Sequence, residues 1–208
     1  MVYPILVIAL TAYLLGNLNG AVCISVLMAD DDVRKHGSGN AGLTNFARNY
    51  GGWSTLLVLL VDAGKTVMAC LMGGMILEPY GYGAEGAMLG AVVVSLGHDF
   101  PALLGFRGGK GIVCGFASAL VIDWRAGLLI LAVFALVYFT THYVSLASLC
   151  GAASFCISIT LFHLGEPLIV CGGLFLGILA IVMHRSNIRR LIQKTEKQTH
   201  LFRKEKNQ

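Results

Sequence analysis

Residues 126–165 form a block of 40 residues that contains no Asp, Glu, Lys or Arg. One helical bilayer crossing needs about 20 predominantly apolar residues, so this block is long enough for two crossings. Its most polar point is TTHYVS, residues 140–145. The chain is therefore predicted to cross the membrane, turn at this point and cross back.

Further apolar blocks extend the pattern over the rest of the chain. Only 12% of the 208 residues are charged, whereas an average soluble domain has about 25%. With two spans in the long block, the sequence predicts an all-α integral membrane protein with seven transmembrane helices. The weakest is the block at 111–122, which is short or re-entrant. The other five blocks are 1–29, 53–77, 86–98, 111–122 and 167–184.

The basic residues predict the orientation of these spans. With the N-terminus outside, all but two of the 15 Lys and Arg residues fall in inner segments; the exceptions are Lys65 and Arg125. This asymmetry favours an outer N-terminus and a cytoplasmic C-terminus. We expect one transmembrane catalytic domain over 1–190 and a basic cytoplasmic tail over 191–208. The inner segments are 30–52, 98–111, 140–145 and 185–208.

The first inner segment contains HGSGNAGLTNFAR, residues 36–48. Closely spaced glycines allow successive backbone N–H groups to converge on an anion. Arg48 adds a planar, permanently charged fork suited to phosphate. The alternative is a flexible Gly/Asn turn between two spans. The candidate substrate-binding positions of this segment, beside Ser38 and Arg48, are Gly37, Gly39, Asn40, Thr44 and Asn45.

The second inner segment contains GHDFP at 97–101 and GFRGGKG at 105–111. A lysine between glycines resembles an oxyanion cradle, but the phosphate-binding pattern of nucleotide enzymes is not met, because Leu104 and Gly111 occupy its fixed positions. The alternative is a glycine hinge with a lysine that reaches the membrane surface. The candidate residues here are Lys110, His98, Gly108, Gly109 and Gly111.

The third inner segment begins HRSNIRR at residue 184. His184 and Asn187 share a face if the last span continues as a helix. The arginines and later basic residues have a simpler interpretation, as anchors to anionic headgroups.

Two smaller features complete the set. Asp62 and Lys65 lie deep in the second span on one helical face, where ionisable groups usually pair, and we expect a structural ion pair. Ser145 and Ser148 follow the turn at 140–145; one is a candidate ligand donor, and a hydroxyl bond to the helix backbone is the alternative.

The stretches GSGNAGLTNFAR, GHDFPALLGFRGGKG and HRSNIRRL, in this order, resemble the signatures of the bacterial acyl-phosphate:glycerol-3-phosphate acyltransferases, the PlsY family. The resemblance covers nearly the whole chain. Two departures are Lys194, where a glycine is common, and Cys114, near a position that is often hydroxylic. The resemblance implies a bacterial inner-membrane enzyme that transfers a fatty acyl group from acyl-phosphate to the 1-hydroxyl of glycerol 3-phosphate, giving lysophosphatidic acid and phosphate.

The resemblance also assigns residues. It implies that Ser38, Arg48 and Lys110 are the leading active-site residues, with His184 and Asn187 beside them. A serine after the fifth span is expected to contribute, either Ser145 or Ser148. It implies acyl-phosphate, glycerol 3-phosphate and membrane lipid as partners, and no nucleic acid, cofactor or metal. Neither the residues nor the resemblance indicates an oligomeric state.

Direct attack by the glycerol hydroxyl, without an acyl-enzyme, suits this set of residues. Acyl-phosphate is already activated, so proximity and charge stabilisation are the main tasks. Lys110 and the backbone amides of Gly108–Gly111 are expected to hold one phosphate and Arg48 the other; which phosphate each holds is open. The proton acceptor is either His184 or a phosphate oxygen of the substrate, which we favour.

Three other function classes fit less well. No histidine is followed five residues later by Asp, which argues against acyltransferases with a His-x4-Asp motif. An anion transporter would show internal repeats and a midplane site, whereas the polar motifs here gather on one side. A non-catalytic scaffold leaves the glycine-rich motifs unexplained.

Overall fold

The computed structural model describes residues 1–199, and every element of regular structure in that range is helical. The first half of the chain forms α1 (Val2–Asn17), α2 (Gly20–Ala29), η1 (Val33–Lys35), α3 (Leu43–Asn49), α4 (Ser54–Leu77), η2 (Glu78–Tyr80), α5 (Gly83–Asp99) and η3 (Ala102–Leu104). The second half forms α6 (Ile112–Ile122), α7 (Trp124–Thr141), α8 (Val144–Phe162), α9 (Pro167–Met183) and α10 (Arg185–Ile192).

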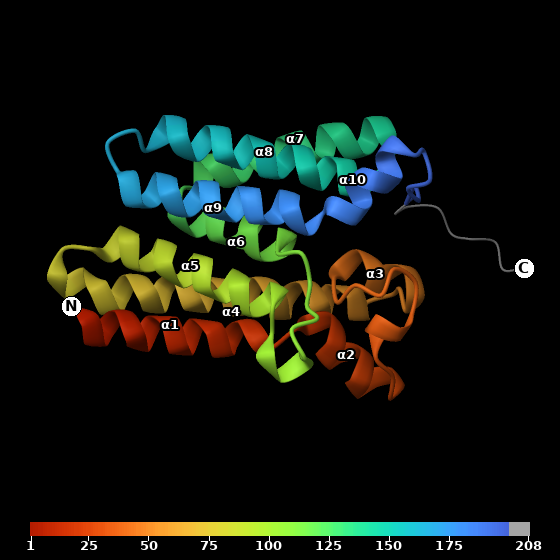
Figure 1. Ribbon diagram of the computed structural model, residues 1–208, viewed down its shortest axis with the longest axis horizontal. Coiled ribbons are helices and arrows are strands. Elements are labelled where there is room, and N and C mark those ends of the chain that lie inside the picture. Colours follow the sequence, from red (N-terminus) through yellow and green to blue (C-terminus); the bar gives the residue numbers. More distant parts are fainter. Residues whose placement is uncertain (200–208) are drawn as a thin grey trace, which may run out of the picture.

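The long helices run roughly along one axis in two groups (Figure 1). Helices α1, α4 and α5 pack together, α8 packs against both α7 and α9, and α6 contacts both groups. The short helices α2, α3 and α10 gather at one end of the molecule, and the α8–α9 connection lies at the other. The described parts of the segments that were predicted to share one side of the membrane therefore lie toward the same end of the bundle.

Small residues allow the first group of helices to pack closely. A Cβ atom added to Gly16 of α1 would lie 2.6 Å from the Cα of Gly97 in α5. Gly73 of α4 and Gly86 of α5 face each other in the same way, each against the other's carbonyl. Apolar helices have little hydrophobic reason to associate in lipid, so close backbone approach through glycine is a common basis for their packing.

The first apolar block is broken in the middle. Asn19 lies between α1 and α2, and its side-chain oxygen accepts the N–H of Val22 at 3.0 Å, which caps α2. The side-chain nitrogen of Asn19 donates to the carbonyl of Ala41 at 2.9 Å. The break therefore anchors the glycine-rich loop that precedes α3.

Within residues 1–199, five helical segments are long and apolar enough to cross a membrane, or six if α9 and α10, bent by 54° at His184, count as one. The predicted turn in the 126–165 block is confirmed, because α7 ends at Thr141 and α8 begins at Val144. The block at 111–122 forms the 11-residue helix α6, which is shorter than these spans. Seven spans and their orientation stay predictions.

Candidate active site

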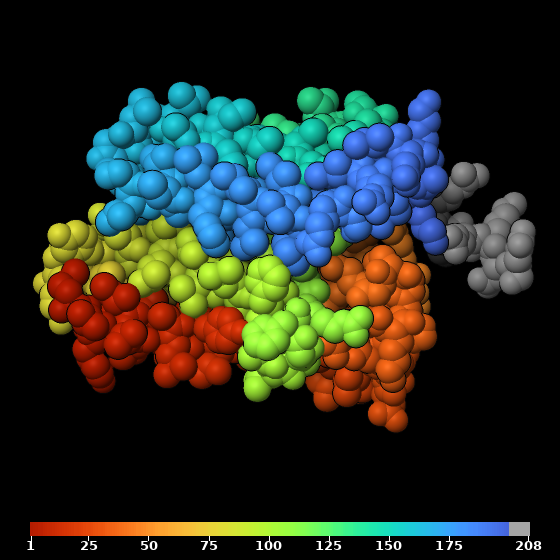
Figure 2. Space-filling view, viewed as in Figure 1, coloured from red at the N-terminus to blue at the C-terminus, as the bar shows by residue number. Residues whose placement is uncertain are grey.

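A cavity of about 420 Å³ opens at the end of the bundle where α3 and α10 lie. Figure 2 shows this end of the surface, where α10 (blue) lies next to residues 36–50 (orange). One side of the cavity is polar and the other is apolar. Its polar or charged lining includes Ser38, Asn40, Thr44, Asn45, Arg48, Asp62, His98, Lys110, Ser145, Ser148, His184, Asn187, Arg190 and Glu196.

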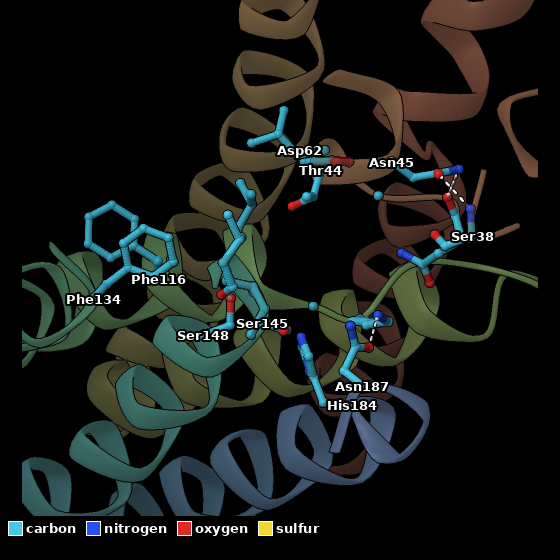
Figure 3. A pocket seen from close by; sticks show the side chains of 18 of the residues that line it. Ser38, Thr44, Asn45, Asp62, Phe116, Phe134, Ser145, Ser148, His184 and Asn187 are labelled. Atoms are coloured by element: carbon cyan, nitrogen blue, oxygen red, sulfur yellow. Dashed lines mark hydrogen bonds between the residues drawn. The ribbon is translucent and has the colours of Figure 1, made fainter. Parts of the chain in front are cut away.

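The structure brings together residues from all three sequence motifs. Ser38, Arg48, Lys110, His184 and Asn187 all line the cavity, although they come from three separate segments. Of the predicted substrate-binding positions, seven line it as well: Asn40, Thr44, Asn45, His98, Gly111, Ser145 and Ser148. Figure 3 shows Ser38 and Asn45 across the cavity from Ser145 and Ser148, with His184 and Asn187 between them. Gly37, Gly39, Gly108 and Gly109 are absent from the described lining.

The glycine-rich loop before α3 is folded around the side chain of Asn45. The side-chain nitrogen of Asn45 donates to the carbonyls of Val33, His36 and Asn40 at 3.0–3.1 Å. Its oxygen accepts the backbone N–H of Ser38 at 2.9 Å. Because the N–H groups of Ser38 and Gly39 already have partners inside the loop, the predicted cradle of free amides is wrong at these two positions. Asn45 shapes the loop that presents the Ser38 side chain.

Positive φ angles explain the two glycines on either side of Ser38. Gly37 has φ +59° and Gly39 has φ +69°, and a Cβ at Gly37 would collide with the Asn45 side chain. Left-handed backbone of this kind costs other residues about 1–2 kcal/mol. These glycines therefore give the loop its shape.

The 105–111 loop is held against the end of α5. The N–H of Gly109 donates to the carbonyl of His98 at 3.0 Å, and a Cβ at this glycine would collide with the His98 ring. The Gly109 amide is therefore also occupied, which corrects the predicted oxyanion role of this amide. Arg34 donates to the carbonyls of Leu104 at 2.8 Å and Arg107 at 3.3 Å, which ties this loop to the first one.

A chain of charged and amide groups crosses the polar side of the cavity. The Nζ of Lys110 donates to Oδ1 of Asn187, and Nδ2 of Asn187 donates to Oε1 of Glu196 at 2.7 Å. Nε of Arg190 donates to Oε2 of the same carboxylate at 2.5 Å. Burial, with a contribution from the nearby Arg190 charge, lowers the pKa of Lys110 to about 8.

Glu196 and Arg190 are the main site residues that the sequence did not reveal. Burial acts to raise the pKa of Glu196, but hydrogen bonds from Arg190 and Asn187 outweigh it and lower the pKa. Arg190 was interpreted as a headgroup anchor, yet its side chain lines the cavity. A usable signal was present, because Glu196 is the only acidic residue between Arg185 and Thr199.

Arg48 is held by the segment that follows α10. Its Nε donates to the hydroxyl of Thr199 at 3.2 Å, and its Nη2 donates to the same hydroxyl and to the carbonyl of Lys197. Burial lowers the pKa of the Arg48 guanidinium. The backbone N–H of Thr199 donates to His142 at the end of α7, so this segment links α3 to α7 across the cavity.

His184 lies at the bend between α9 and α10 and is buried. Its Nδ1 lies 2.8 Å from the carbonyl of Ala180. A carbonyl only accepts, so Nδ1 carries the proton and Nε2 holds the lone pair when the ring is neutral. The hydroxyl of Ser148 bonds to the carbonyl of Val144 at 2.9 Å, whereas Ser145 lies beside Glu196. Ser145 is thus the serine closer to the charged groups.

The predicted ion pair in the second span is confirmed. Lys65 and Asp62 are buried, and their Nζ and Oδ1 atoms lie 2.9 Å apart. Lys65 also donates to the carbonyl of Leu18 at 2.7 Å and lies 2.9 Å from Nδ1 of His98. Asp62 accepts the N–H of Gly20 at 3.0 Å. The pair braces the break between α1 and α2, while Asp62 and His98 also reach the cavity wall.

Among residues 1–199, no group of three or more His, Cys, Asp or Glu side chains is arranged to hold a metal ion. The described cavity instead offers basic, amide and hydroxyl groups, which are suited to anionic ligands.

Comparison with known proteins agrees with this geometry. The family model described as glycerol-3-phosphate acyltransferase matches residues 6–194. A glycerol-3-phosphate acyltransferase of Thermoanaerobacter sp. (strain X514) is 38% identical over 188 residues, which cover 90% of this chain and 92% of that protein.

Solved structures give the same result. The crystal structure of PlsY (YgiH), an integral membrane glycerol 3-phosphate acyltransferase, in its glycerol 3-phosphate form superposes with a TM-score of 0.87 at 28% identity, covering 96% of this chain and 99% of that one. Its lysophosphatidic acid form gives a TM-score of 0.81 at 26% identity, covering 95% and 96%. Together with the apolar helices, this likeness identifies a multi-pass membrane protein. The chain belongs to the glycerol-3-phosphate acyltransferase family.

Proposed function

We propose that this protein transfers a fatty acyl group from acyl-phosphate to the 1-hydroxyl of glycerol 3-phosphate. The products are lysophosphatidic acid and inorganic phosphate. The observation that carries this proposal is the two-sided cavity, with Arg48, Lys110 and Asn187 at one side and aromatic and aliphatic side chains at the other. The two substrates together present the same two chemistries, phosphate groups and a long apolar chain.

The basic and amide residues hold the phosphate groups in this proposal. Lys110 and Arg48 each bind one phosphate, and a charge-assisted hydrogen bond of this kind contributes about 1.5–3 kcal/mol. Ser38, Asn40 and Thr44 supply neutral partners from the first loop. Gly37, Gly39, Asn45, Gly108 and Gly109 act by shaping the two loops, and Gly111 and His98 complete the wall beside Lys110.

The apolar side of the cavity accommodates the acyl chain. It is lined by Phe116 of α6 and Phe134 of α7, which Figure 3 shows beyond Ser148. A smaller apolar cavity shares both phenylalanines and continues between α8 and α9, past Gly151 and Gly177. A chain that enters here leaves its reactive carbonyl at the polar side, next to the phosphate-binding groups.

The reaction proceeds by direct attack. The 1-hydroxyl oxygen bonds to the acyl carbon, the bond from that carbon to the phosphate oxygen breaks, and the phosphate leaves. Orienting two bound reactants can contribute about 7–11 kcal/mol to lowering the barrier, and Lys110 and Asn187 stabilise the developing negative charge. The hydroxyl proton passes to a phosphate oxygen of the substrate. Protonating the buried His184 would instead place a second positive charge beside Lys110, which is unfavourable.

The same proposal includes the membrane arrangement. Seven spans, an outer N-terminus and a cytoplasmic C-terminus in the bacterial inner membrane would open the cavity toward the water-soluble substrate. Residues 1–190 form the catalytic domain. The tail comprises 191–208, of which 200–208 lie outside the described residues, and its described part contributes Glu196 to the cavity.

The donor can be tested directly. The purified full chain in detergent receives glycerol 3-phosphate with either palmitoyl-phosphate or palmitoyl-CoA, and lysophosphatidic acid and phosphate are measured. We expect equal amounts of both products with palmitoyl-phosphate. Turnover with palmitoyl-CoA alone would refute the proposed donor.

A second assay tests direct attack. Labelled inorganic phosphate is incubated with the enzyme and palmitoyl-phosphate in the absence of glycerol 3-phosphate. An acyl-enzyme would form reversibly and transfer label into the donor, whereas direct attack gives no exchange. Exchange at a rate comparable to turnover contradicts the mechanism proposed here.

A further inference from the structure

Arg190 lines the cavity with the inner nitrogen of its guanidinium bound by the protein and the outer end of the group available to a ligand. Its side chain is 36% exposed. Only Nε is engaged, by the carboxylate of Glu196 at 2.5 Å, whereas neither terminal nitrogen has a hydrogen-bond partner within residues 1–199. Those two nitrogens form the end of the guanidinium fork that binds phosphate oxygens in pairs.

Glu196 fixes this arrangement from a buried position. Its side chain is 4% exposed, and its carboxylate accepts hydrogen bonds from both Arg190 and Asn187. Asn187 in turn accepts a hydrogen bond from Lys110. One carboxylate therefore orients Arg190 directly and Lys110 through an amide. Glu196 itself has little accessible surface left, so it acts as a positioning residue.

The charge of the substrates calls for more than two basic groups. A phosphate monoester such as glycerol 3-phosphate carries a charge of about −1.5 to −2 near neutral pH, and the proposed reaction brings it together with the anionic phosphate group of the acyl donor. Arg48 and Lys110 supply two positive charges. Arg190, the third cation of the described cavity lining, brings the basic charge closer to that of the ligands.

We propose that Arg190 is a third phosphate-binding residue of this active site, positioned by Glu196 so that its two terminal nitrogens face the ligand. The inference rests on the proposed function only in taking a phosphate-bearing molecule as the ligand. The binding chemistry is the same for glycerol 3-phosphate, the phosphate of the acyl donor and the inorganic phosphate product.

Equilibrium dialysis of the full chain in detergent, with labelled inorganic phosphate or glycerol 3-phosphate, tests the inference. We expect Arg190→Gln to raise the Kd for at least one of the two by tenfold or more. Arg189→Gln is the matched control, because it removes the same charge from an exposed neighbour on α10, and its Kd should stay within twofold of the wild type. If the Kd values of Arg190→Gln lie within twofold of those of the Arg189→Gln control for both ligands, the inference is overturned.

The double variant Arg190→Gln/Glu196→Gln distinguishes a phosphate-binding role of Arg190 from a purely structural role. It removes both partners together and leaves no unpaired buried charge. If Arg190 binds phosphate, the Kd stays raised although the thermal unfolding temperature recovers toward that of the wild type. Recovery of the wild-type Kd shows a structural brace only and refutes the proposal. Neither ligand requires an acyl donor, so wild-type protein that binds phosphate without transferring acyl groups would contradict the proposed function alone.

Discussion

Two charged clusters lie at opposite ends of the helical bundle, and they differ in how their charges are balanced. The cavity cluster consists of Arg48, Lys110, Arg190 and Glu196. The far-end cluster consists of Asp123, Arg125, His163 and Glu166, where α6 meets α7 and α8 meets α9.

The far-end cluster is internally satisfied. Arg125 makes a forked contact with the carboxylate of Asp123, His163 lies 3.2 Å from the same carboxylate, and Glu166 lies 3.0 Å from the other nitrogen of His163. Arg125 also lies over the Phe162 ring. The cavity cluster, by contrast, has three cations for one carboxylate. Charge that the protein does not balance itself is available to balance a ligand.

The largest expected effect is that of Lys110→Ala. Removing a preorganised charged donor from an active site typically lowers kcat by about 10²–10³-fold. The measurement is lysophosphatidic acid formation per molecule of folded enzyme. Arg125→Ala is the matched control, because it removes one positive charge from the far-end cluster, and we expect its turnover to stay within about twofold. Equal losses in both variants would show that the two clusters do not differ as described.

The pKa of Lys110 predicts a pH dependence that the far-end cluster does not share. Burial lowers this pKa to about 8, so the cation is present below pH 8 and is lost as the pH rises through it. In the free enzyme, we expect the Kd for inorganic phosphate to rise by up to tenfold per pH unit above about 8. A Kd that stays flat from pH 7 to 9.5 would contradict the role given to Lys110.

At the far end, substitution should alter stability and leave catalysis intact. Asp123 accepts the N–H of Arg125 at 2.9 Å as the cap of α7, and loss of such a cap costs about 1 kcal/mol. Hydrogen bonding to Arg125 lowers the pKa of Asp123 to about 2. The ionised Asp123 carboxylate therefore stabilises the folded state fully above about pH 3.9, the ordinary pKa of Asp, and this stabilisation is lost as the pH falls through about 2. We expect Asp123→Ala to lower the unfolding temperature at pH 7, with kcat/KM unchanged. A marked loss of kcat/KM would show that this end also serves catalysis.

The smallest effect concerns the segment that carries Glu196 into the cavity. Lys194 has φ +56°, a left-handed conformation that favours glycine and costs other residues about 1–2 kcal/mol. Glycine is also more flexible in the unfolded chain, so Lys194→Gly should raise the free energy of unfolding by about 0.5–1 kcal/mol. Thermal unfolding in detergent measures this change, with Lys197→Gly as the control. A lower unfolding temperature would show that the lysine side chain is itself a needed contact.

Patterns along the chain revealed most of the fold and much of the cavity lining. Runs with few or no charges predicted the long helices, because a helix that crosses the membrane must be predominantly apolar. The three motifs predicted Ser38, Arg48, Lys110, His184 and Asn187, and all five line one cavity. The ion pair of Asp62 and Lys65 followed from their depth and spacing.

Contacts between distant segments were beyond the sequence patterns. Asn45 resembled a ligand donor, but its amide is used by the loop around it, which depends on how that loop closes. Arg190 was interpreted as an anchor to anionic headgroups and Glu196 was placed in the basic cytoplasmic tail, because the sequence patterns did not predict the 54° bend at His184 that precedes both residues. Lys194 was noted as a departure from the family pattern, and its positive φ gives the physical reason why glycine is common there.

A structure of this protein with glycerol 3-phosphate tests the central claim most directly, which is that the unbalanced cations of the cavity cluster bind the substrate. The account predicts that the phosphate group lies within hydrogen-bonding distance of at least two of Arg48, Lys110 and Arg190, with the 1-hydroxyl directed toward the apolar side of the cavity. A phosphate bound at the far-end cluster, or bound without contact to any of these three cations, would contradict it.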